Sequence, residues 1–255
     1  MFAIERRNHI MTLLNELKSL SVQEMAVNLC VAEETIRRDL KELESLGLLI
    51  RTHGGAVLAD DSKTEVSLAH REGINVFGKD IIGKEAAAMV KDGDTIILDA
   101  STSALSVAKH LKDKQGLTVI TNAEKVVFEL AGQDEITVIS TGGTLRHQSL
   151  SYVGRAAVEA LSKYYANRVF FSCKGLTRNR GLTDSNEQEA EIRRTMIQNS
   201  EQVVFLCDYT KFGKVGYVNT VGLEAVDMIL LDRPLPEEWQ AEIAAKGIRA
   251  KVAEG

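Results

Sequence analysis

The first 58 residues have apolar positions spaced as in short amphipathic helices. Within residues 5–17, 22–29 and 36–46, apolar side chains recur every three or four positions, which places them on one helical face. The predicted inward positions are Ile10, Leu13, Leu14, Leu17, Val22, Met25, Ala26, Leu29, Ile36, Leu40, Leu43 and Leu46. We therefore predict three helices that pack these faces together.

Local signals set the boundaries of these helices. Ser21, followed three residues later by Glu24, fits a capping box at the start of the second helix. Gly47 fits a stop after the third helix. The Gly54-Gly55 pair separates two strand-like runs, 48–51 and 56–58, and predicts a tight hairpin. Three helices and a hairpin in this order predict a winged helix-turn-helix in residues 1–58, with the helix-turn-helix at about residues 20–39.

The pattern changes after the hairpin. Residues 59–75 are polar and mixed in charge, and we predict a linker that becomes helical. From about Lys79, helical patterns alternate with short aliphatic runs, which suits strands covered on both faces. The predicted strands are Thr95–Leu98, Leu117–Ile120, Ile136–Ser140, Val169–Ser172, Val203–Leu206 and Met228–Leu231. Residues 76–255 are thus predicted to form a mostly parallel α/β domain, with a final helix and a short strand within 233–250.

Composition narrows the class of protein. The chain has 255 residues, 44% hydrophobic content and a formal net charge of −5, so it forms a globular core and does not coat nucleic acid or membranes through bulk charge. Its three cysteines form no C-x-x-C pair, which favours reduced thiols. We find no apolar signal-peptide region and no run of about 18 apolar residues, and we expect a cytoplasmic location.

The third predicted helix carries cations away from its apolar stripe. Thr35, Arg37, Arg38 and Lys41 project outward, and the hairpin adds Arg51 and His53 beside Gly54. Arginine pairs with guanine edges, and both cations neutralise phosphates. The alternative is an ordinary solvated face, because residues 1–58 contain seven Lys and Arg against eight Asp and Glu. The ordered set of capped helix, turn, arginine helix and glycine hairpin favours DNA binding.

The stretch "ETIRRDLKELESLGLLIRTHGGAV" resembles the DNA-binding signature of the DeoR family of bacterial transcriptional regulators, and the spacing back to Arg6 also fits. The resemblance implies a DNA-binding surface that includes Ser21 with the residues named above. Ala32 departs from the family, which usually has a serine there. Asp39 would repel phosphate if it faced DNA, so we expect it to have a structural role as a local partner for an arginine.

Polar residues follow the predicted strands of the second domain. Ligands of open α/β sheets collect beyond the carboxyl ends of the strands, and hydroxyls at a helix start favour a phosphate. Helix capping and ordinary loop chemistry are the alternatives for any one position. The predicted effector-binding residues are Asp99, Ser101, Thr102, Ser103, Thr121, Asn122, Gly142, Gly143, Lys174, Asp208 and Lys211. Together they suit a phosphorylated sugar or polyol.

The resemblance to the DeoR family extends over residues 4 to 232 and includes "GLTDSNEQEAEIRRTMI" and "DYTKFG". It implies a sensor domain similar in fold to ribose-5-phosphate isomerase and glucosamine-6-phosphate deaminase. Ala100-Ser101-Thr102-Ser103 departs from the family pattern of glycine or serine followed by paired threonines. The segment "FFSCKGL" also departs from the family pattern, which reads closer to F-I-G-A-x-G, and we expect Lys174 to add a positive contact particular to this protein.

The resemblance leaves an enzyme as the alternative. The segment "TGGTLRH" has no carboxylate where related isomerases place acidic residues, and His147 is its lone candidate base. We find no metal-ligand spacing and no Walker or dinucleotide pattern, so we expect no cofactor and no catalytic residue. We predict a homo-oligomeric DNA-binding regulator, a repressor of a carbohydrate operon controlled by a sugar phosphate. The alternatives are an isomerase or deaminase fused to a DNA-binding domain, and a winged-helix adaptor that binds protein.

Overall fold

A computed structural model describes residues 2–46, 48–58 and 65–254. The chain divides into two compact units, Met1–His70 and Arg71–Gly255, and each is described by itself below. Gly47, the predicted helix stop, and residues 59–64 of the predicted linker lie outside the described residues. The later part of that linker contains helix α4 (Leu68–Gly73).

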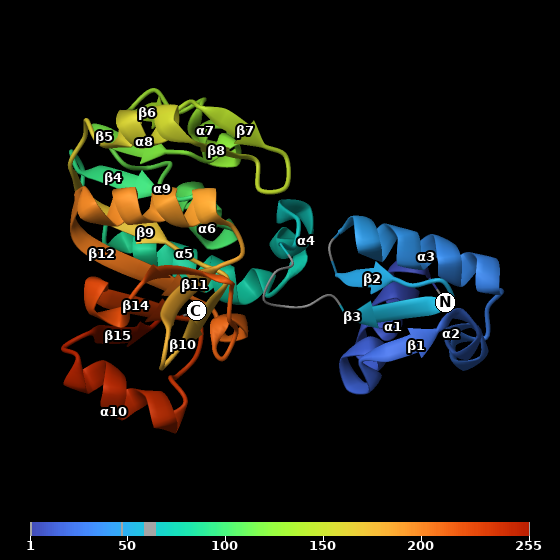
Figure 1. Ribbon diagram of the computed structural model, residues 1–255. Coiled ribbons are helices and arrows are strands. Elements are labelled where there is room, and N and C mark those ends of the chain that lie inside the picture. Colours follow the sequence, from blue (N-terminus) through green and yellow to red (C-terminus); the bar gives the residue numbers. More distant parts are fainter. Residues whose placement is uncertain (1, 47, 59–64, 255) are drawn as a thin grey trace. The chain divides into compact units, whose positions relative to one another are not determined.

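The N-terminal unit is a winged helix-turn-helix, as predicted. Its elements are α1 (Ala3–Leu17), β1 (Ser19–Ser21), α2 (Val22–Leu29), α3 (Glu33–Ser45), β2 (Leu49–Arg51) and β3 (Gly55–Leu58) (Figure 1). Ile10, Met25 and Ile36 from the three helices are fully buried. The prediction for Leu17 was wrong, because α1 ends there, the chain turns at Lys18 with φ 65°, and the Leu17 side chain is 55% exposed.

The predicted hairpin gains a third strand. The antiparallel order is β1-β3-β2, and Gly55 pairs with Ser21. A Cβ atom on Gly55 would lie 2.1 Å from the carbonyl oxygen of Leu20, whereas one on Gly54 would meet nothing within 4 Å. Gly55 is therefore required for the approach of β1, and Gly54 is open to its surroundings.

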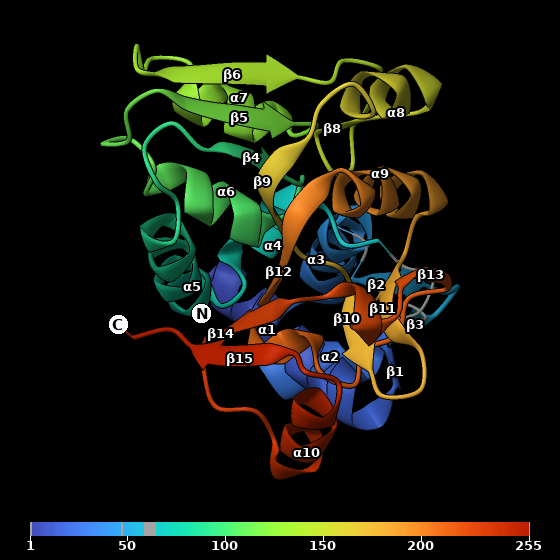
Figure 2. The ribbon, with the colours of Figure 1, turned by 90° about the vertical axis from the view of Figure 1, so that its left-hand side faces the viewer.

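The C-terminal unit is built on a seven-stranded parallel sheet in the order β15-β14-β12-β9-β4-β5-β6. Figure 2 shows this order from β6 at the top to β15 at the bottom. The strands are β4 (Thr95–Leu98), β5 (Leu117–Thr121), β6 (Ile136–Ser140), β9 (Ala166–Phe171), β12 (Ser200–Cys207), β14 (Met228–Leu231) and β15 (Arg249–Val252). All six predicted strands and the final short strand are confirmed.

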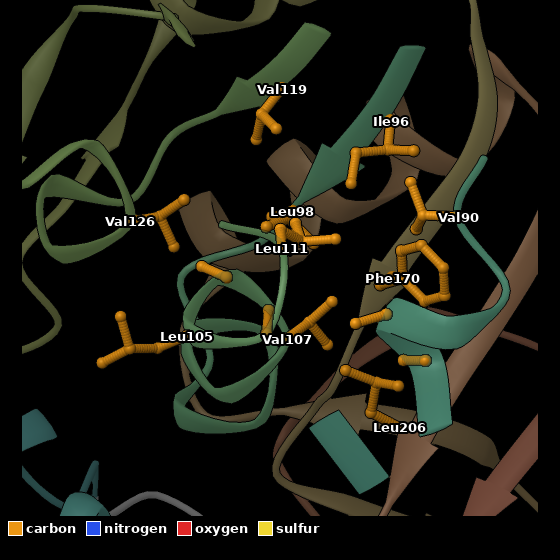
Figure 3. Packing of buried hydrophobic residues seen from close by; sticks show 14 of the residues in the cluster. Val90, Ile96, Leu98, Leu105, Val107, Leu111, Val119, Val126, Phe170 and Leu206 are labelled. Carbon is orange, nitrogen blue, oxygen red and sulfur yellow. The ribbon is translucent and has the colours of Figure 1, made fainter. Parts of the chain in front are cut away.

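Helices cover both faces of this sheet. The helices are α5 (Val76–Ala88), α6 (Thr102–Lys109) and α7 (Glu124–Leu130) on one face, and α8 (Arg155–Leu161), α9 (Glu187–Gln198) and α10 (Glu237–Ala245) on the other. A hydrophobic core lies on each face of the sheet, and successive residues of a strand point into alternate cores. Ile96 and Leu98 therefore face α6, whereas Ile97 faces the opposite side. Figure 3 shows the first of these cores, with Leu98 and Phe170 beside Val107. This two-sided burial explains the non-alternating aliphatic runs.

The order of the strands reverses beside β4. The chain runs from β4 through β5 to β6 and then returns to β9 on the other side of β4. Short elements follow the carboxyl ends of β6, β9 and β12 and were not predicted. They are β7 (Thr144–Arg146), β8 (Ser151–Val153), β10 (Gly175–Thr177), β11 (Gly181–Asp184), β13 (Val218–Val221), η1 (Tyr209–Lys211) and η2 (Leu223–Ala225). The edge of the sheet where the strands end, here called the carboxyl edge, is thus bordered by these inserted segments.

Across residues 2–46, 48–58 and 65–254, no helix has the length and apolar character needed to cross a membrane.

The close approach at Gly55 gives a stability prediction. Gly55→Ala should destabilise the N-terminal unit by about 3 kcal/mol, because a backbone carbonyl occupies the position of the new methyl group. Hydrogen exchange of the buried α2 and α3 amides measures this change. Gly54→Ala is the matched control and should cost less than about 1 kcal/mol. Equal effects of the two substitutions would contradict the assignment.

Candidate functional site

The start of α2 is fixed by the predicted capping box. The Ser21 hydroxyl accepts a hydrogen bond from the Glu24 amide over 3.1 Å, and the Ser21 amide donates to the Glu24 carboxylate over 2.8 Å. The helix ends at Cys30, whose φ of 52° turns the chain into α3. Ser21 therefore has a structural role of its own at the position predicted to contact DNA.

The outward face of α3, defined as Thr35, Arg37, Arg38 and Lys41, lies opposite its buried stripe. Arg37, Arg38 and Lys41 are exposed and Thr35 is half-buried. Arg37 donates to Glu33 over 2.7 Å, whereas Arg38 and Lys41 have no hydrogen bond or ion pair to any described residue. The face thus presents two cations that no described residue neutralises.

Asp39 is removed from this face by burial. It is 2% exposed, and its carboxylate accepts hydrogen bonds from Arg6 over 2.5 Å and from Arg7 over 3.2 Å. The prediction that Asp39 pairs with an arginine is confirmed, and both partners come from α1. This pairing attaches α1 to α3 and keeps a negative charge away from the outward face.

The hairpin contains the remaining residues of this unit that were predicted to bind DNA. The side chain of Arg51 donates to Glu44 over 2.6 Å, and His53 and Gly54 are exposed at the turn. The Gly54 carbonyl accepts a hydrogen bond from the Val22 amide over 2.8 Å, so the turn is attached to the start of α2. Ala32 begins α3 without a side-chain cap, as its residue type requires.

In the C-terminal unit, the hydroxyl cluster begins α6 at the end of β4. The Ser101 hydroxyl accepts from the Ala104 amide over 3.0 Å and is the N-cap of the helix. Thr102 and Ser103 are also buried, and neither hydroxyl has a hydrogen-bond partner within the described part of the chain. The capping alternative therefore applies to Ser101, and the next two hydroxyls remain available to a ligand.

Asp99 belongs to a buried ion-pair network centred on Arg193 of α9. Arg193 donates to Asp99 over 2.8 Å and to Asp184 over 2.9 Å, and it lies 3.7 Å from Glu189. Burial raises the pKa of Asp99, and the guanidinium opposes this rise. Burial lowers the pKa of Arg193, but the three carboxylates outweigh it and hold the pKa well above its ordinary value.

This network was not predicted, although its residues lie in the stretch "GLTDSNEQEAEIRRTMI". Glu189 also accepts from Arg146 over 3.0 Å and from Ser149 over 2.7 Å. A charged residue on the apolar face of a helix could have indicated this network from the sequence, because such residues are rarely buried without partners. Arg193 thereby connects α9 to the ends of β4 and β11.

The two polar residues at the end of β5, Thr121 and Asn122, differ in how fully their side chains are hydrogen-bonded within the described protein. The Thr121 hydroxyl donates to the Leu98 carbonyl over 2.7 Å and accepts from the Ala123 amide over 3.0 Å. The Asn122 amide nitrogen donates to the Tyr152 carbonyl over 3.0 Å, but its Oδ1 is buried without a partner among the described residues. Such an atom is costly to leave unpaired, so Asn122 is the better ligand candidate of the two.

The glycine pair after β6 is explained by the backbone. Gly142 has φ 60° and Gly143 has φ 112°, which glycine adopts far more easily than other residues. A Cβ atom on Gly143 would lie 2.8 Å from the Val153 carbonyl oxygen, so Gly143 allows the β7–β8 hairpin to pack closely. Gly142 has open space around its Cα.

The remaining candidates follow β9 and β12. The Lys174 amide donates to Asp184 over 3.3 Å. Asp208 is fully buried: its Oδ1 accepts from the Thr210 amide over 3.0 Å, and its Oδ2 has no hydrogen-bond donor in the described chain. The Lys211 ammonium lies 4.0 Å from that Oδ2. Lys79 of α5 is a further buried cation near this pair, and sequence reasoning missed it.

A hollow of about 660 Å³ borders this region without containing any predicted site residue. It is lined by Thr177, Arg178, Asn179, Phe212, Gly213, Pro236, Glu238, Trp239 and Glu242. The Arg178 guanidinium donates to Glu242 over 2.6 Å across it. None of the predicted effector-binding residues lines it, so this hollow does not support the predicted site.

Comparisons with known proteins agree with this architecture. Residues 6–62 match the DeoR-like helix-turn-helix domain, and residues 74–233 match the DeoR C terminal sensor domain. The uncharacterised HTH-type transcriptional regulator YulB of Bacillus subtilis is 42% identical over 92% of this chain and 91% of its own length. The HTH-type transcriptional repressor GlcR of the same organism is 32% identical over 100% of this chain and 98% of its own.

Among solved structures, a ribose-5-phosphate isomerase in complex with phospho-erythronic acid matches with a TM-score of 0.41. The two chains are 13% identical, and the match covers 54% of each.

The Arg193 network gives a prediction of stability and pH dependence. Arg193→Met should destabilise the C-terminal unit by about 4 kcal/mol at neutral pH, because it leaves buried carboxylates without their cation. Those carboxylates would have raised pKa values in the folded variant, so they favour folding at low pH and oppose it as pH rises. The loss should therefore be smaller at pH 5 than at pH 8.

Denaturant unfolding followed by the fluorescence of Trp239, the single tryptophan, measures this loss. Arg194→Met on the same helix is the matched control, since Arg194 donates to the Asn219 carbonyl at an exposed position. A loss in Arg193→Met no larger than in the control would refute a central role for Arg193.

Proposed function

Because this chain belongs to the DeoR family of transcriptional regulators, we propose that it binds operator DNA with the outward face of α3 and senses a phosphorylated sugar or polyol at the carboxyl edge. Family membership identifies the chain as a DNA-binding transcriptional regulator rather than an enzyme. The site residues, the effector and the sign of regulation are the proposal. Since the proposed partner is operator DNA, we further propose a cytoplasmic location.

The DNA-binding proposal is carried by the unpaired cations Arg38 and Lys41. Arginine and lysine release counterions when they contact phosphates, and arginine also reads guanine in the major groove. Arg37 and Arg51 have exposed carboxylate partners, and exchange of an exposed ion pair for a phosphate costs little. In the proposal, Thr35 joins the outward face, Ser21 with the start of α2 lies at the DNA backbone, and His53 and Gly54 form the tip of the wing.

The effector proposal is carried by unpaired polar groups at the carboxyl edge. Asn122 and Asp208 each have a buried oxygen without a donor in the described chain, and the hydroxyls of a sugar or polyol are donors for both. Thr102 and Ser103 offer hydroxyls at the start of α6. Lys174 and Lys211 supply the positive charge that a phosphate needs. Open sheets also bind ligands where the order of their strands reverses, and in this sheet the order reverses beside β4.

Five of the predicted effector-binding residues do not contact the effector directly in this proposal. They are Asp99, Ser101, Thr121, Gly142 and Gly143. The first three make internal hydrogen bonds, and the glycines allow the turn after β6. We propose that these residues shape the effector site, and that the direct contacts come from Thr102, Ser103, Asn122, Lys174, Asp208 and Lys211.

We propose that the regulator is a repressor of a carbohydrate operon and acts as a homo-oligomer. GlcR, similar over its whole length, is named a transcriptional repressor. One small DNA-binding module has limited affinity, and paired half-sites multiply it. The effector must prefer one arrangement of the DNA-binding units, because differential affinity is what shifts such an equilibrium. We propose that it prefers the DNA-free arrangement.

The DNA-binding proposal predicts that Arg38→Ala weakens operator binding at least about tenfold and lowers the slope of log affinity against log salt by about 1. Fluorescence anisotropy with DNA upstream of the chain's own gene cluster, at several salt concentrations, measures both. Arg155→Ala is the control, because it removes an arginine that is 91% exposed in the other unit. Equal behaviour of the two variants would exclude Arg38 from the interface.

The effector proposal predicts that the double substitution Thr102→Val with Ser103→Ala weakens binding of the effector at least about tenfold, since both hydroxyls are lost while shape is largely kept. Calorimetric titration with a panel of sugar phosphates measures the affinity. Ser106→Ala on the same helix is the control, because it removes a buried hydroxyl one turn further along α6. If no sugar phosphate binds the native protein, the effector proposal fails.

A further inference from the structure

The hollow of about 660 Å³ lies between α10, the turn from β10 to β11, and the residues that follow η1. Figures 1 and 2 show β10 beside α10, and the ion pair of Arg178 with Glu242 joins the two segments. A Cβ atom on Gly213 would meet nothing within 4 Å, so this side of the hollow is open. The hollow has the size of a small-molecule site, and it shares no residue with the effector site proposed above.

Aromatic side chains form part of the lining. The rings of Phe212 and Trp239 meet edge to face, with centroids 5.4 Å apart and planes at 69°. Phe212 is half-buried, and Pro236 lines the hollow next to these rings. A pair of rings in this arrangement can pack against a third flat group. The lining therefore favours a ligand with a flat apolar part.

The charged residues of the lining are one arginine and two glutamates, which leaves an excess of negative charge. Glu242 pairs with Arg178, whereas the carboxylate of Glu238 has no hydrogen bond or ion pair to any described residue. An acidic residue in the first turn of a helix also stabilises the helix dipole. Glu237 occupies the same turn and does not line the hollow, so it separates that effect from ligand binding.

A second, independent observation comes from Thr177, which ends β10 and lines the hollow. Its hydroxyl oxygen is buried and has no hydrogen-bond partner among the described residues. Such a group is costly to leave unpaired. Rotation about the Cα–Cβ bond moves the hydroxyl between staggered positions, and a ligand with N–H donors in the hollow would give it a partner.

We propose that this hollow binds a small ligand that combines a flat apolar ring with an ammonium group, an arylalkyl amine in chemical class. The ring packs against Phe212 and Trp239, and the ammonium lies against the Glu238 carboxylate. An ammonium has three N–H donors, so it can also serve Glu242 and the Thr177 hydroxyl.

The ion pair of Arg178 with Glu242 does not prevent this binding. The Arg178 side chain is 54% exposed, and an exposed guanidinium that gives up part of an ion pair to a ligand loses little. Phe212 and Gly213 directly follow η1, so the ligand contacts the residues next to Lys211 while the effector site stays separate.

Titration of the full-length protein with phenethylamine at neutral pH tests the site, with calorimetry and the fluorescence of Trp239, the single tryptophan, as readouts. The native protein should bind it saturably, with a dissociation constant at or below about 1 mM. Phenylpropionate is the matched ligand control, because a carboxylate replaces the ammonium on the same phenyl frame. It should bind at least about tenfold more weakly, since the glutamates repel it.

Three variants at exposed or half-exposed positions locate the contact. Glu238→Gln should weaken phenethylamine binding at least about tenfold, because it removes the unpaired charge and keeps the shape. Glu237→Gln is the matched control and should bind within about twofold of the native protein. Arg178→Gln leaves Glu242 to the ligand and should strengthen binding about threefold. Denaturant unfolding of each variant checks that it is folded.

The outcomes decide both the site and the ligand class. If phenethylamine does not bind saturably, or if Glu238→Gln binds it within twofold of the native protein, the site is overturned. If phenylpropionate binds as tightly as phenethylamine, or if Arg178→Gln weakens the binding of phenethylamine, the class of ligand is overturned. Because the hollow and the effector site share no residue, each of these failures leaves the effector proposal standing.

Discussion

The C-terminal unit depends on the buried guanidinium of Arg193. This one group binds Asp99 at the end of β4 and Asp184 at the end of β11, and it lies near Glu189 on its own helix. Each carboxylate would be costly to bury alone, and the cation removes most of that cost. The network thereby fixes α9, β4 and β11 at the place where the order of the strands reverses. A rigid carboxyl edge follows, on which the neighbouring side chains keep their positions.

This rigidity divides the polar residues of the edge into two groups. Asp99, Ser101 and Thr121 make hydrogen bonds within the protein and hold the strand ends together. Asn122 and Asp208 retain buried oxygens without hydrogen-bond donors in the described chain, and Lys79 and Lys211 place two positive charges near Asp208. The second group has the chemistry of a ligand site. An unpaired buried oxygen persists in a native protein when something else justifies its cost, and a polyol phosphate would do so.

The N-terminal unit also buries a carboxylate against arginine side chains, with fewer partners than in the Arg193 network. Asp39 is buried against Arg6 and Arg7, so the negative charge of α3 lies inside and its cations lie outside. The unit has no basic excess overall, so its exposed positive face results from this spatial separation of charge. The family match identifies a helix-turn-helix domain in residues 6–62, and the geometry leaves Arg38 and Lys41 exposed on α3 of that domain.

The sequence by itself determined the main elements of this protein, but not β1 or the short segments inserted after β6, β9 and β12. Local patterns sufficed for the three helices, the wing, the six parallel strands and the closing helix and strand, because buried faces and caps are set by residues a few positions apart. It also located the hydroxyl loop and the arginine helix. Tertiary structure alone decided which polar residues hold the fold and which remain unpaired, since Asp99 and Arg193 lie 94 residues apart in sequence. It also decided that Gly55 serves β1 and that Lys79 lies beside Lys211. Hydrogen bonds and charge pairs at such separations depend on how the elements pack, which no local pattern encodes.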